Sequence, residues 1–331
     1  MATYKGIKGF KVQSLASDPT ASESIGQMWY NTTSYVLKYS IQGAGAWAAG
    51  GNTNTAVDLA GYCGTQTAAM YFGGRNTVTT ATVTSETYNG TAWTETADLT
   101  TPTYQNAGFG TTTAAISTGG LPPPAANDNT FTYNGTSWTA ANGMQTNKRD
   151  IHGTGTQTAG MIAGGTPGPV NAQLVEIYDG TSWTEANDLL TGRWGIPVVG
   201  ITTAALAIGG NDGAPRGTVI VEEYNGTSWS EENNMNQAKY WSGAAGTTTA
   251  ALLFAGDDEA GGVPVTKTAE SWNGTSWTSI ADLATARTAV CSGQASSNTA
   301  ALCFGGEVPP ISQLTEEYND PVYSIKTVTA S

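Results

Sequence analysis

The sequence predicts an all-β fold in which a four-stranded unit of about 46 residues occurs six times. Two sequence markers recur in one register along the chain, and the composition suits short strands and tight turns. Charged residues make up only 12% of the 331 residues, and glycine occurs 42 times. Such a composition is unfavourable for helices. The count of six rests on the second marker, and the first marker leaves a count of seven open as the alternative.

The first marker is a tryptophan, replaced by tyrosine in its last copy. Its copies lie 45 to 48 residues apart, at Trp47, Trp93, Trp138, Trp183, Trp229, Trp277 and Tyr323. The second marker is an apolar strand that ends in a pair of small residues. It comes 26 residues after the tryptophan in five copies and 28 in the sixth, and its first small residues are Gly73, Gly119, Gly164, Gly209, Ala255 and Gly305. Because both markers keep one register, we infer a structural repeat.

A short turn motif precedes five of the tryptophans, as in YNGTSWT at 133–139. Asn-Gly and Asp-Gly are the commonest centres of type I′ hairpin turns, in which both central residues have a positive φ. Four copies also match the Asn-Gly-Thr acceptor for N-glycosylation. The fifth copy has Asp179, which removes the acceptor but keeps the turn chemistry. We therefore expect a structural hairpin turn.

Each repeat contains four predicted strands, which in the second repeat cover 104–111, 113–119, 129–134 and 137–141. Four strands in a repeat of this length are typical of a β-propeller. We expect the repeated tyrosines and tryptophans to pack between neighbouring sheets. Six glycine pairs accompany seven tryptophan-type positions, so one of the latter is surplus. We expect Trp47 to lie in the outer strand of the last sheet, beside 314–319, and to close the ring; Tyr323 is the alternative.

Three segments are expected along the chain: an N-terminal extension over 1–44, the propeller over 45–323 and a C-terminal tail over 324–331. Within the extension, 14–24 is predicted to be a loop. The stretch GQMWYNTTSYVLKYS at 26–40 is predicted to be a hairpin because its apolar residues alternate.

Composition also excludes several classes of function. The net charge of −13 argues against binding to nucleic-acid phosphates and to anionic lipid. No apolar run is long enough to span a membrane, and the first residues lack a secretory signal, so synthesis in a cytoplasm is expected.

The three cysteines, Cys63, Cys291 and Cys303, are expected to be buried free thiols. The single histidine, His152, excludes most zinc sites, and no cofactor is expected.

The glycine pair after an apolar strand, followed by a tyrosine and a tryptophan, resembles the kelch repeat over about 45–323. In one departure from that pattern, the tyrosine and tryptophan are only five residues apart, shorter than the usual kelch interval. The resemblance implies a propeller and leaves the chemistry open. The Asp-box hairpins of sialidases occupy a similar outer position, but the leading Ser-x-Asp is missing from this sequence.

The stretch at 26–40 resembles segments near the N-termini of bacteriophage virion proteins, especially tail-fibre and appendage proteins. The repeat background, rich in threonine, alanine and glycine, is similar to propellers encoded by marine phages. This resemblance implies a virion location, other virion proteins as partners, and a homo-oligomer or several copies on the particle. The alternative is that 1–44 only covers an edge of the propeller.

Binding is expected where the repeats differ, at the loops between the second and third strands and between neighbouring units. The residues ten and eleven positions after each marker tryptophan, together with Trp241 beside Tyr240, include basic and aromatic side chains. Such side chains suit sugar rings, which they bind by stacking and by hydrogen bonds to hydroxyls. The candidate ligand residues are Tyr104, Lys148, Arg149, Arg193, Trp194, Lys239, Tyr240, Trp241 and Arg287. Alternatively, the cations pair with glutamates that precede the marker tyrosines and Trp272, namely Glu86, Glu176, Glu222, Glu270 and Glu316, although Phe131 has this place once.

Two further sites are weaker candidates. Asp257, Asp258 and Glu259 are oxygen donors of the kind that Ca²⁺ prefers, but their spacing matches no calcium-loop motif, and a solvated acidic loop is favoured. His152 is the only reasonable general base, although a lone loop histidine is more often polar surface. No catalytic constellation is found.

The leading hypothesis is a non-enzymatic virion protein that binds a host glycan or another virion protein. A carbohydrate-active enzyme of the sialidase or lyase type, and a cellular kelch scaffold, are the alternatives.

Overall fold

The computed structural model describes residues 12–21, 24–77, 79–121, 125–166, 171–213, 217–258, 265–320 and 322–328. The fold is all-β, as predicted. The chain forms two compact units: residues 1–46 with 319–331, and residues 47–318. This division differs from the expected one, because the C-terminal residues belong to the smaller unit rather than forming a separate tail.

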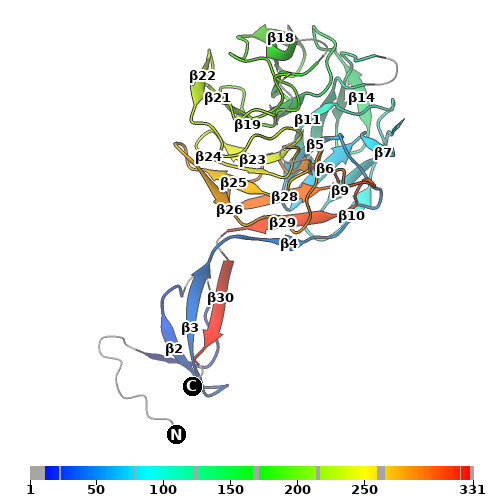
Figure 1. Ribbon diagram of the computed structural model, residues 1–331. Helices are drawn as coiled ribbons and strands as arrows, with labels where there is room; N and C mark the ends of the chain where they lie inside the picture. Colours follow the sequence, from blue (N-terminus) through cyan, green and yellow to red (C-terminus); the bar gives the residue numbers. More distant parts are fainter. Residues whose placement is uncertain are drawn as a thin grey trace. The chain divides into compact units, whose positions relative to one another are not determined.

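The larger unit contains, within its described residues, six four-stranded sheets that follow one another along the chain (Figure 1). The strands of the first two sheets are β5 (Gly61–Thr65), β6 (Ala68–Phe72), β9 (Ser85–Tyr88) and β10 (Trp93–Glu95), then β11 (Ala107–Thr111), β12 (Ala114–Thr118), β13 (Thr130–Tyr133) and β14 (Trp138–Ala141). Those of the next two are β15 (His152–Thr156), β16 (Ala159–Ala163), β17 (Val175–Tyr178) and β18 (Trp183–Ala186), then β19 (Val198–Ile201), β20 (Ala204–Ile208), β21 (Val221–Tyr224) and β22 (Trp229–Glu232).

The fifth and sixth sheets consist of β23 (Gly243–Thr247), β24 (Ala250–Phe254), β25 (Ala269–Trp272) and β26 (Trp277–Ile280), then β27 (Cys291–Ser292), β28 (Ala300–Phe304), β29 (Thr315–Asn319) and β4 (Ala46–Ala49). A short ribbon, β7 (Arg75–Thr77) with β8 (Thr80–Ala81), and a 3₁₀ turn, η1 (Asn171–Gln173), lie in loops. The strands predicted for the second repeat agree with β11 to β14 to within three residues.

The first strands of the six sheets contact one another in order, and β27 of the last sheet contacts β5 of the first. Backbone hydrogen bonds join the residues just before these strands. In each bond the N–H of one residue donates to the C=O of another. The donor and acceptor pairs are Gln105 and Leu59, Asp150 and Gln105, Gly195 and Asp150, Trp241 and Gly195, and Leu59 and Ala289. The last of these joins the first repeat to the sixth. This arrangement is consistent with a β-propeller.

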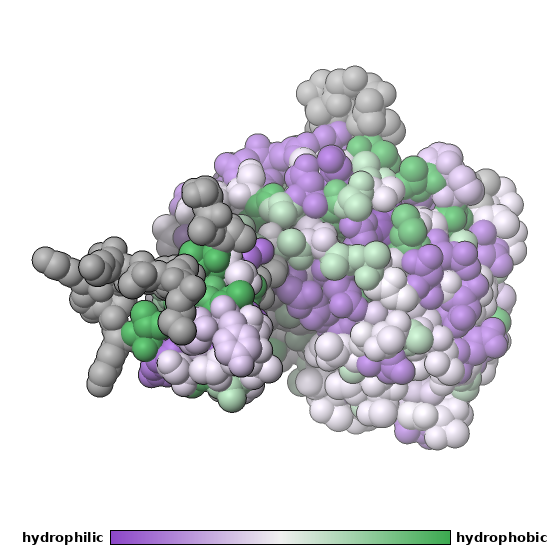
Figure 2. All heavy atoms as spheres, turned by 90° about the horizontal axis from the view of Figure 1, so that it is seen from below, coloured by the Kyte–Doolittle hydropathy of each residue, from purple (hydrophilic) through white to green (hydrophobic). Residues whose placement is uncertain are grey.

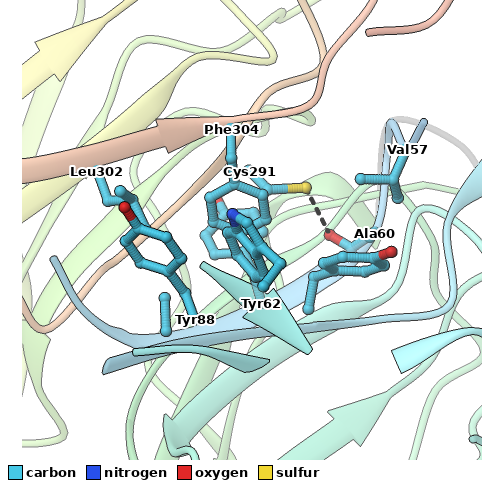
Figure 3. Packing of buried hydrophobic residues seen from close by; sticks show 10 residues of the cluster. Val57, Ala60, Tyr62, Tyr88, Cys291, Leu302 and Phe304 are labelled. Carbon is cyan, nitrogen blue, oxygen red and sulfur yellow. Dashed lines mark hydrogen bonds between the residues drawn. The ribbon is translucent and has the colours of Figure 1, made fainter. Parts of the chain in front are cut away.

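The last sheet includes a strand from the far end of the repeat region. β4, which contains Trp47, lies beside β29 in the sheet order, as the sequence predicted. Tyr323 instead belongs to β30 (Val322–Thr327), where it pairs with Gln42 of β3 in the smaller unit. Residues of the first and last repeats also share one apolar cluster: Figure 3 shows Val57, Ala60 and Tyr62 beside Cys291 and Phe304.

The marker tryptophans pack between sheets, as predicted. Trp138 has its ring centroid 4.8 Å from that of Phe72 in the preceding sheet, and Trp93 lies 4.5 Å from Phe304. Each also faces the tyrosine across its own turn, as Trp138 does with Tyr133 at 5.0 Å. The repeated aromatic residues are therefore core, and each of them buries a large area.

The turn before each tryptophan is a hairpin, but the predicted type is wrong in one respect. Only the glycine has a positive φ, as at Gly135 with +91°, and the preceding asparagine does not. Asn134 instead accepts hydrogen bonds on Oδ1 from the N–H groups of Thr136 and Ser137. Asp179 does the same with Thr181 and Ser182. The glycine at the first central position is typical of a type II′ turn, and the side chain before it forms an Asx turn.

The smaller unit is a four-stranded sheet in the order β1 (Gln13–Leu15), β2 (Met28–Asn31), β3 (Val36–Gly43) and β30. β2 and β3 form the predicted hairpin, and β1 pairs with β2 in parallel. Asp18 accepts hydrogen bonds from Trp29, Asn31 and Lys38, which ties the 14–24 segment to the sheet. Figure 2 shows hydrophobic residues at its surface, and Tyr35 is 76% exposed.

Candidate functional site

The four basic residues expected at a ligand rim are buried inside the repeats. Lys148, Arg193, Lys239 and Arg287 are at most 1% exposed. Arg193 Nη2 lies 2.9 Å from Glu222 Oε1, and the other cations face the equivalent glutamates: Arg287 lies 2.8 Å from Glu316, Lys148 lies 4.0 Å from Glu176, and Lys239 interacts with Glu270. Since these four side chains are fully buried and face glutamates, they belong to the interior and not to a rim.

The glutamates also hold the segment that enters each repeat. Glu222, for example, accepts hydrogen bonds from the N–H groups of Leu190 and Thr191. Repeat 2 has Phe131 in place of the glutamate, and the same repeat has Thr103 in place of the cation. Repeat 1 has Val57 in place of the cation, and its Glu86 accepts a hydrogen bond from Tyr71 Oη instead. No repeat therefore has the cation without its glutamate, which is the pattern expected of a structural pair.

The residue after each of these cations has a different environment. Trp194, Tyr240 and Trp241 form an aromatic cluster in which all three ring centroids lie 5.0 to 5.3 Å apart. Trp194 and Trp241 are half-buried, whereas Tyr240 is buried. The aromatic cluster lies where first strands begin and second strands end, which we call the loop end. Of the predicted ligand residues, Tyr104, Arg149, Trp194 and Trp241 keep accessible surface, and Tyr240 packs beneath the two indoles.

A groove of about 240 Å³ lies beside Trp194. Its other lining residues are Thr166, Ala172, Gly192, Asn211, Asp212 and Gly213. Trp194 and Asn211 exchange two backbone hydrogen bonds, so the indole and the Asn211–Gly213 loop are held at the same place. Arg149 Nε donates to Thr166 Oγ1 at 3.2 Å, and Arg149 thereby adjoins the groove. An aromatic face, an amide and a carboxylate thus surround one hollow.

A narrow recess opens inside the ring of first strands at the loop end. It is lined by Leu59, Ala60, Tyr62, Gln105, Asn106, Asp150, Ile151, His152, Trp241, Ala289 and Val290. The residue twelve positions after the marker tryptophan has a positive φ in all six repeats. The φ values are 48° (Leu59), 58° (Gln105), 53° (Asp150), 60° (Gly195), 50° (Trp241) and 53° (Ala289). All of these residues except Gly195 line the recess. A Cβ on Gly195 would lie 2.7 Å from Trp241 Cδ1, so glycine here leaves room for the indole.

Asp150 is the acidic residue of this recess. Burial raises the pKa of its carboxyl to about 6, and Arg149, Trp241 and Thr166 partly oppose that shift. Trp241 Nε1 donates to Asp150 Oδ1 at 3.3 Å, and Thr166 Oγ1 donates to Oδ2 at 3.4 Å. Asp150 therefore connects the recess with the aromatic cluster and with the groove.

His152 begins β15 and is half-buried, and its Nδ1 atom is buried. Burial lowers the pKa of its imidazole to about 4. Its ring centroid lies 5.8 Å from that of Tyr62. The imidazole is therefore neutral at physiological pH.

The remaining candidates have structural contacts. The guanidinium carbon of Arg75, in repeat 1, lies 5.5 Å from the centroid of the Tyr104 ring, in repeat 2. Arg75 Nη2 also lies 2.6 Å from Asp58 Oδ2. Tyr104 therefore packs against repeat 1. Asp257 and Asp258 are buried rather than solvated, and Asp258 Oδ2 accepts a hydrogen bond from Gln237. Glu259 lies outside the described residues. No group of three possible metal ligands occurs among the residues that the structure describes. Cys63, Cys291 and Cys303 are buried and free, as predicted.

The chain matches no family model and no curated protein. In the described part of the chain, no helix is long and apolar enough to cross a membrane.

Sequence reasoning missed the recess and its residues Gln105 and Asp150. The signal was present, because both lie one position beyond the candidate residues of their repeats. It was overlooked because Leu59, Gln105, Asp150, Gly195, Trp241 and Ala289 share a backbone conformation and not a side-chain type.

Proposed function

We propose that the protein is a non-enzymatic, glycan-binding β-propeller with six kelch-like blades, displayed in several copies on a bacteriophage particle. The observation that carries the proposal is the aromatic cluster at the loop end, with the groove beside Trp194. Aromatic faces cover the apolar faces of sugar rings, and amide and carboxylate groups bind sugar hydroxyls through hydrogen bonds. Asn211 and Asp212, which line the groove with Trp194, provide an amide and a carboxylate.

The fold supports binding at this end rather than at the turns. The turns repeat with nearly the same residues, whereas the loops at the loop end differ in every repeat, as in GNDGAPRG and GDDEAGGVP. Variable loops on a rigid scaffold are where recognition is usually placed. Backbone hydrogen bonds between neighbouring repeats fix the positions of Asp150 and Trp241, and the backbone of Trp194 is held by Asn211 of its own repeat.

The virion location rests on the N-terminal segment. The hairpin of β2 and β3 contains the stretch that resembles phage tail-fibre and appendage proteins, and it belongs to a separate compact unit. We infer that this unit attaches the protein to other virion proteins while the larger unit presents the loop end. Labelling the protein on purified particles and imaging them tests this location; a particle without the label contradicts it.

The binding function is tested on the wild type and two matched variants. Trp194→Ala removes a ring of the aromatic cluster, and Tyr104→Ala removes the ring at the same repeat position in another repeat. Binding to host surfaces and to a glycan array is measured together with thermal melting. We expect Trp194→Ala to lose binding and Tyr104→Ala to keep it.

Three results would contradict the proposal: no binding of the wild type to any host surface or glycan, equal loss in both variants, or release of sugar products. The last would favour a carbohydrate-active enzyme.

A further inference from the structure

The recess contains two polar atoms that no described group satisfies. Gln105 Oε1 and His152 Nδ1 are buried and have no hydrogen-bond partner among the described residues. Both residues line the same recess, together with Asp150 and Trp241. Because leaving a buried polar atom unpaired is costly, such atoms usually face a water or a ligand. The recess therefore has room and partners for a polar group that the rest of the described chain does not supply.

The size and chemistry of the recess restrict that group. Its volume is about 20 Å³, which accommodates one water-sized group and not a sugar ring. Gln105 Oε1 only accepts hydrogen bonds, whereas Nδ1 of a neutral imidazole donates or accepts according to its tautomer. A hydroxyl donates to Gln105 Oε1 and accepts from Nδ1–H in the tautomer that carries the proton on Nδ1, so in that tautomer it satisfies both atoms. A cation would meet Arg149, whose Nε lies 3.9 Å from Asp150 Oδ2, and an anion would meet Asp150 itself.

The recess adjoins the aromatic cluster already described. Trp241 lines the recess, Trp194 lines the groove, and their ring centroids are 5.3 Å apart. Trp241 is also held by its hydrogen bond to Asp150. A ligand that covers both indoles therefore reaches the recess at one side and Asn211 at the other.

We propose that the recess binds one hydroxyl of a neutral sugar ring that stacks on Trp241, while the next sugar unit lies in the groove beside Trp194 and Asn211. This inference rests on the proposed function and makes it specific. The ligand is a neutral oligosaccharide of at least two units, and a single hydroxyl group selects it.

The test uses the double variant Gln105→Leu/His152→Ala. Both new residues already occupy these repeat positions elsewhere, as Leu59 and Ala107, so the variant is matched to the backbone. The probes are the neutral oligosaccharide that binds best on the array, its analogues that each lack one hydroxyl, and its constituent monosaccharides. Affinities are measured by titration calorimetry. We expect one deoxy analogue to bind the wild type at least about tenfold more weakly, a typical loss for one buried hydrogen-bonded group, and the variant to bind that analogue and the parent equally.

The outcomes separate this inference from the proposed function. If the wild type binds all deoxy analogues alike, or the variant keeps the discrimination, a bound water satisfies the two atoms and the inference fails while glycan binding stands. A monosaccharide that binds as tightly as the oligosaccharide also overturns it. If Trp194→Ala binds normally, or the wild type binds no glycan, the proposed function fails first. Should the variant not fold, the analogue series on the wild type decides.

Discussion

Two neighbouring residues of one repeat show how the interior and the loop end differ. Arg193 is buried against Glu222, and three other repeats contain an equivalent pair. Trp194, the next residue, is half-buried and contacts Tyr240 and Trp241. The residues that recur at one repeat position hold the sheets together, whereas the position beside them varies among Asp58, Tyr104, Arg149, Trp194, Tyr240 and Thr288. Of these six, Trp194 lines the groove. The comparison indicates that positions that recur between repeats serve the fold, and that positions that differ between repeats are the better candidates for binding.

The largest effect is expected from breaking an interior pair. Arg193→Thr leaves Glu222 buried without its cation, and we expect a loss of about 3–5 kcal/mol in the free energy of unfolding. The double variant Arg193→Thr/Glu222→Phe copies Thr103 and Phe131 of repeat 2. It should recover most of that loss in denaturant titrations. A double variant as unstable as the sum of the two single variants would show that the pair is not an independent structural unit.

Much of this interior could be predicted from sequence. The repeat spacing gave the strands, the place of Trp47 and the glutamates that pair with Lys148, Arg193, Lys239 and Arg287. The turn type was wrong because Asn134 and Asp179 serve as side-chain acceptors, and nothing in the residue pair Asn-Gly distinguishes that role from a positive φ. The repeat position of Gln105 and Asp150 is visible in the sequence. The recess that they line could not be predicted, because its residues come from five repeats and their convergence depends on how the ring closes.

The loop end should differ from the interior in its response to pH. Burial raises the pKa of Asp150 to about 6 from its ordinary value of 3.8. The folded protein then binds the proton before the unfolded chain does, so this residue makes stability rise as pH falls from about 6 to 4. Asp150→Asn should remove that contribution, which amounts to roughly 2–3 kcal/mol over the window. Denaturation at several pH values, compared between wild type and variant, measures it.

His152 provides the opposite sign in the same recess. Burial lowers the pKa of its imidazole to about 4, so the unfolded chain binds the proton first and stability falls as pH drops from about 6.5 to 4. His152→Ala should therefore flatten the acid side of the profile, and Asp150→Asn should steepen it. Profiles that change in the same direction for both variants would contradict the burial of one of these groups.

The Asn-Gly turns that join the third and fourth strands offer a smaller test, because their residues are exposed and repeat almost unchanged. Gly135 has φ +91°, and a Cβ there would meet only Thr113 at 3.6 Å. Gly135→Val should cost about 1–2 kcal/mol through backbone strain alone. Asn134→Asp copies Asp179 and should be nearly neutral. Thermal melting of the two variants measures the difference, and glycan binding should be unaffected in both. Equal melting temperatures would show that the turn does not need a positive φ.

The smallest expected effect is a gain in stability at the one repeat that departs from the glycine pair. Ala255 occupies the position of Gly73, Gly119, Gly164, Gly209 and Gly305, and it has φ +58°. An L-residue in this conformation costs roughly 1–2 kcal/mol, whereas glycine adopts it readily but loses about 0.5–1 kcal/mol more backbone entropy on folding. Ala255→Gly should therefore stabilise the protein by up to about 1 kcal/mol. The reverse change at Gly164 is the matched control, because a Cβ there would lie 2.3 Å from the carbonyl oxygen of Arg193, and this variant should be clearly destabilised. If Ala255→Gly lowers the melting temperature, the methyl group of Ala255 contributes more through packing than its backbone strain costs.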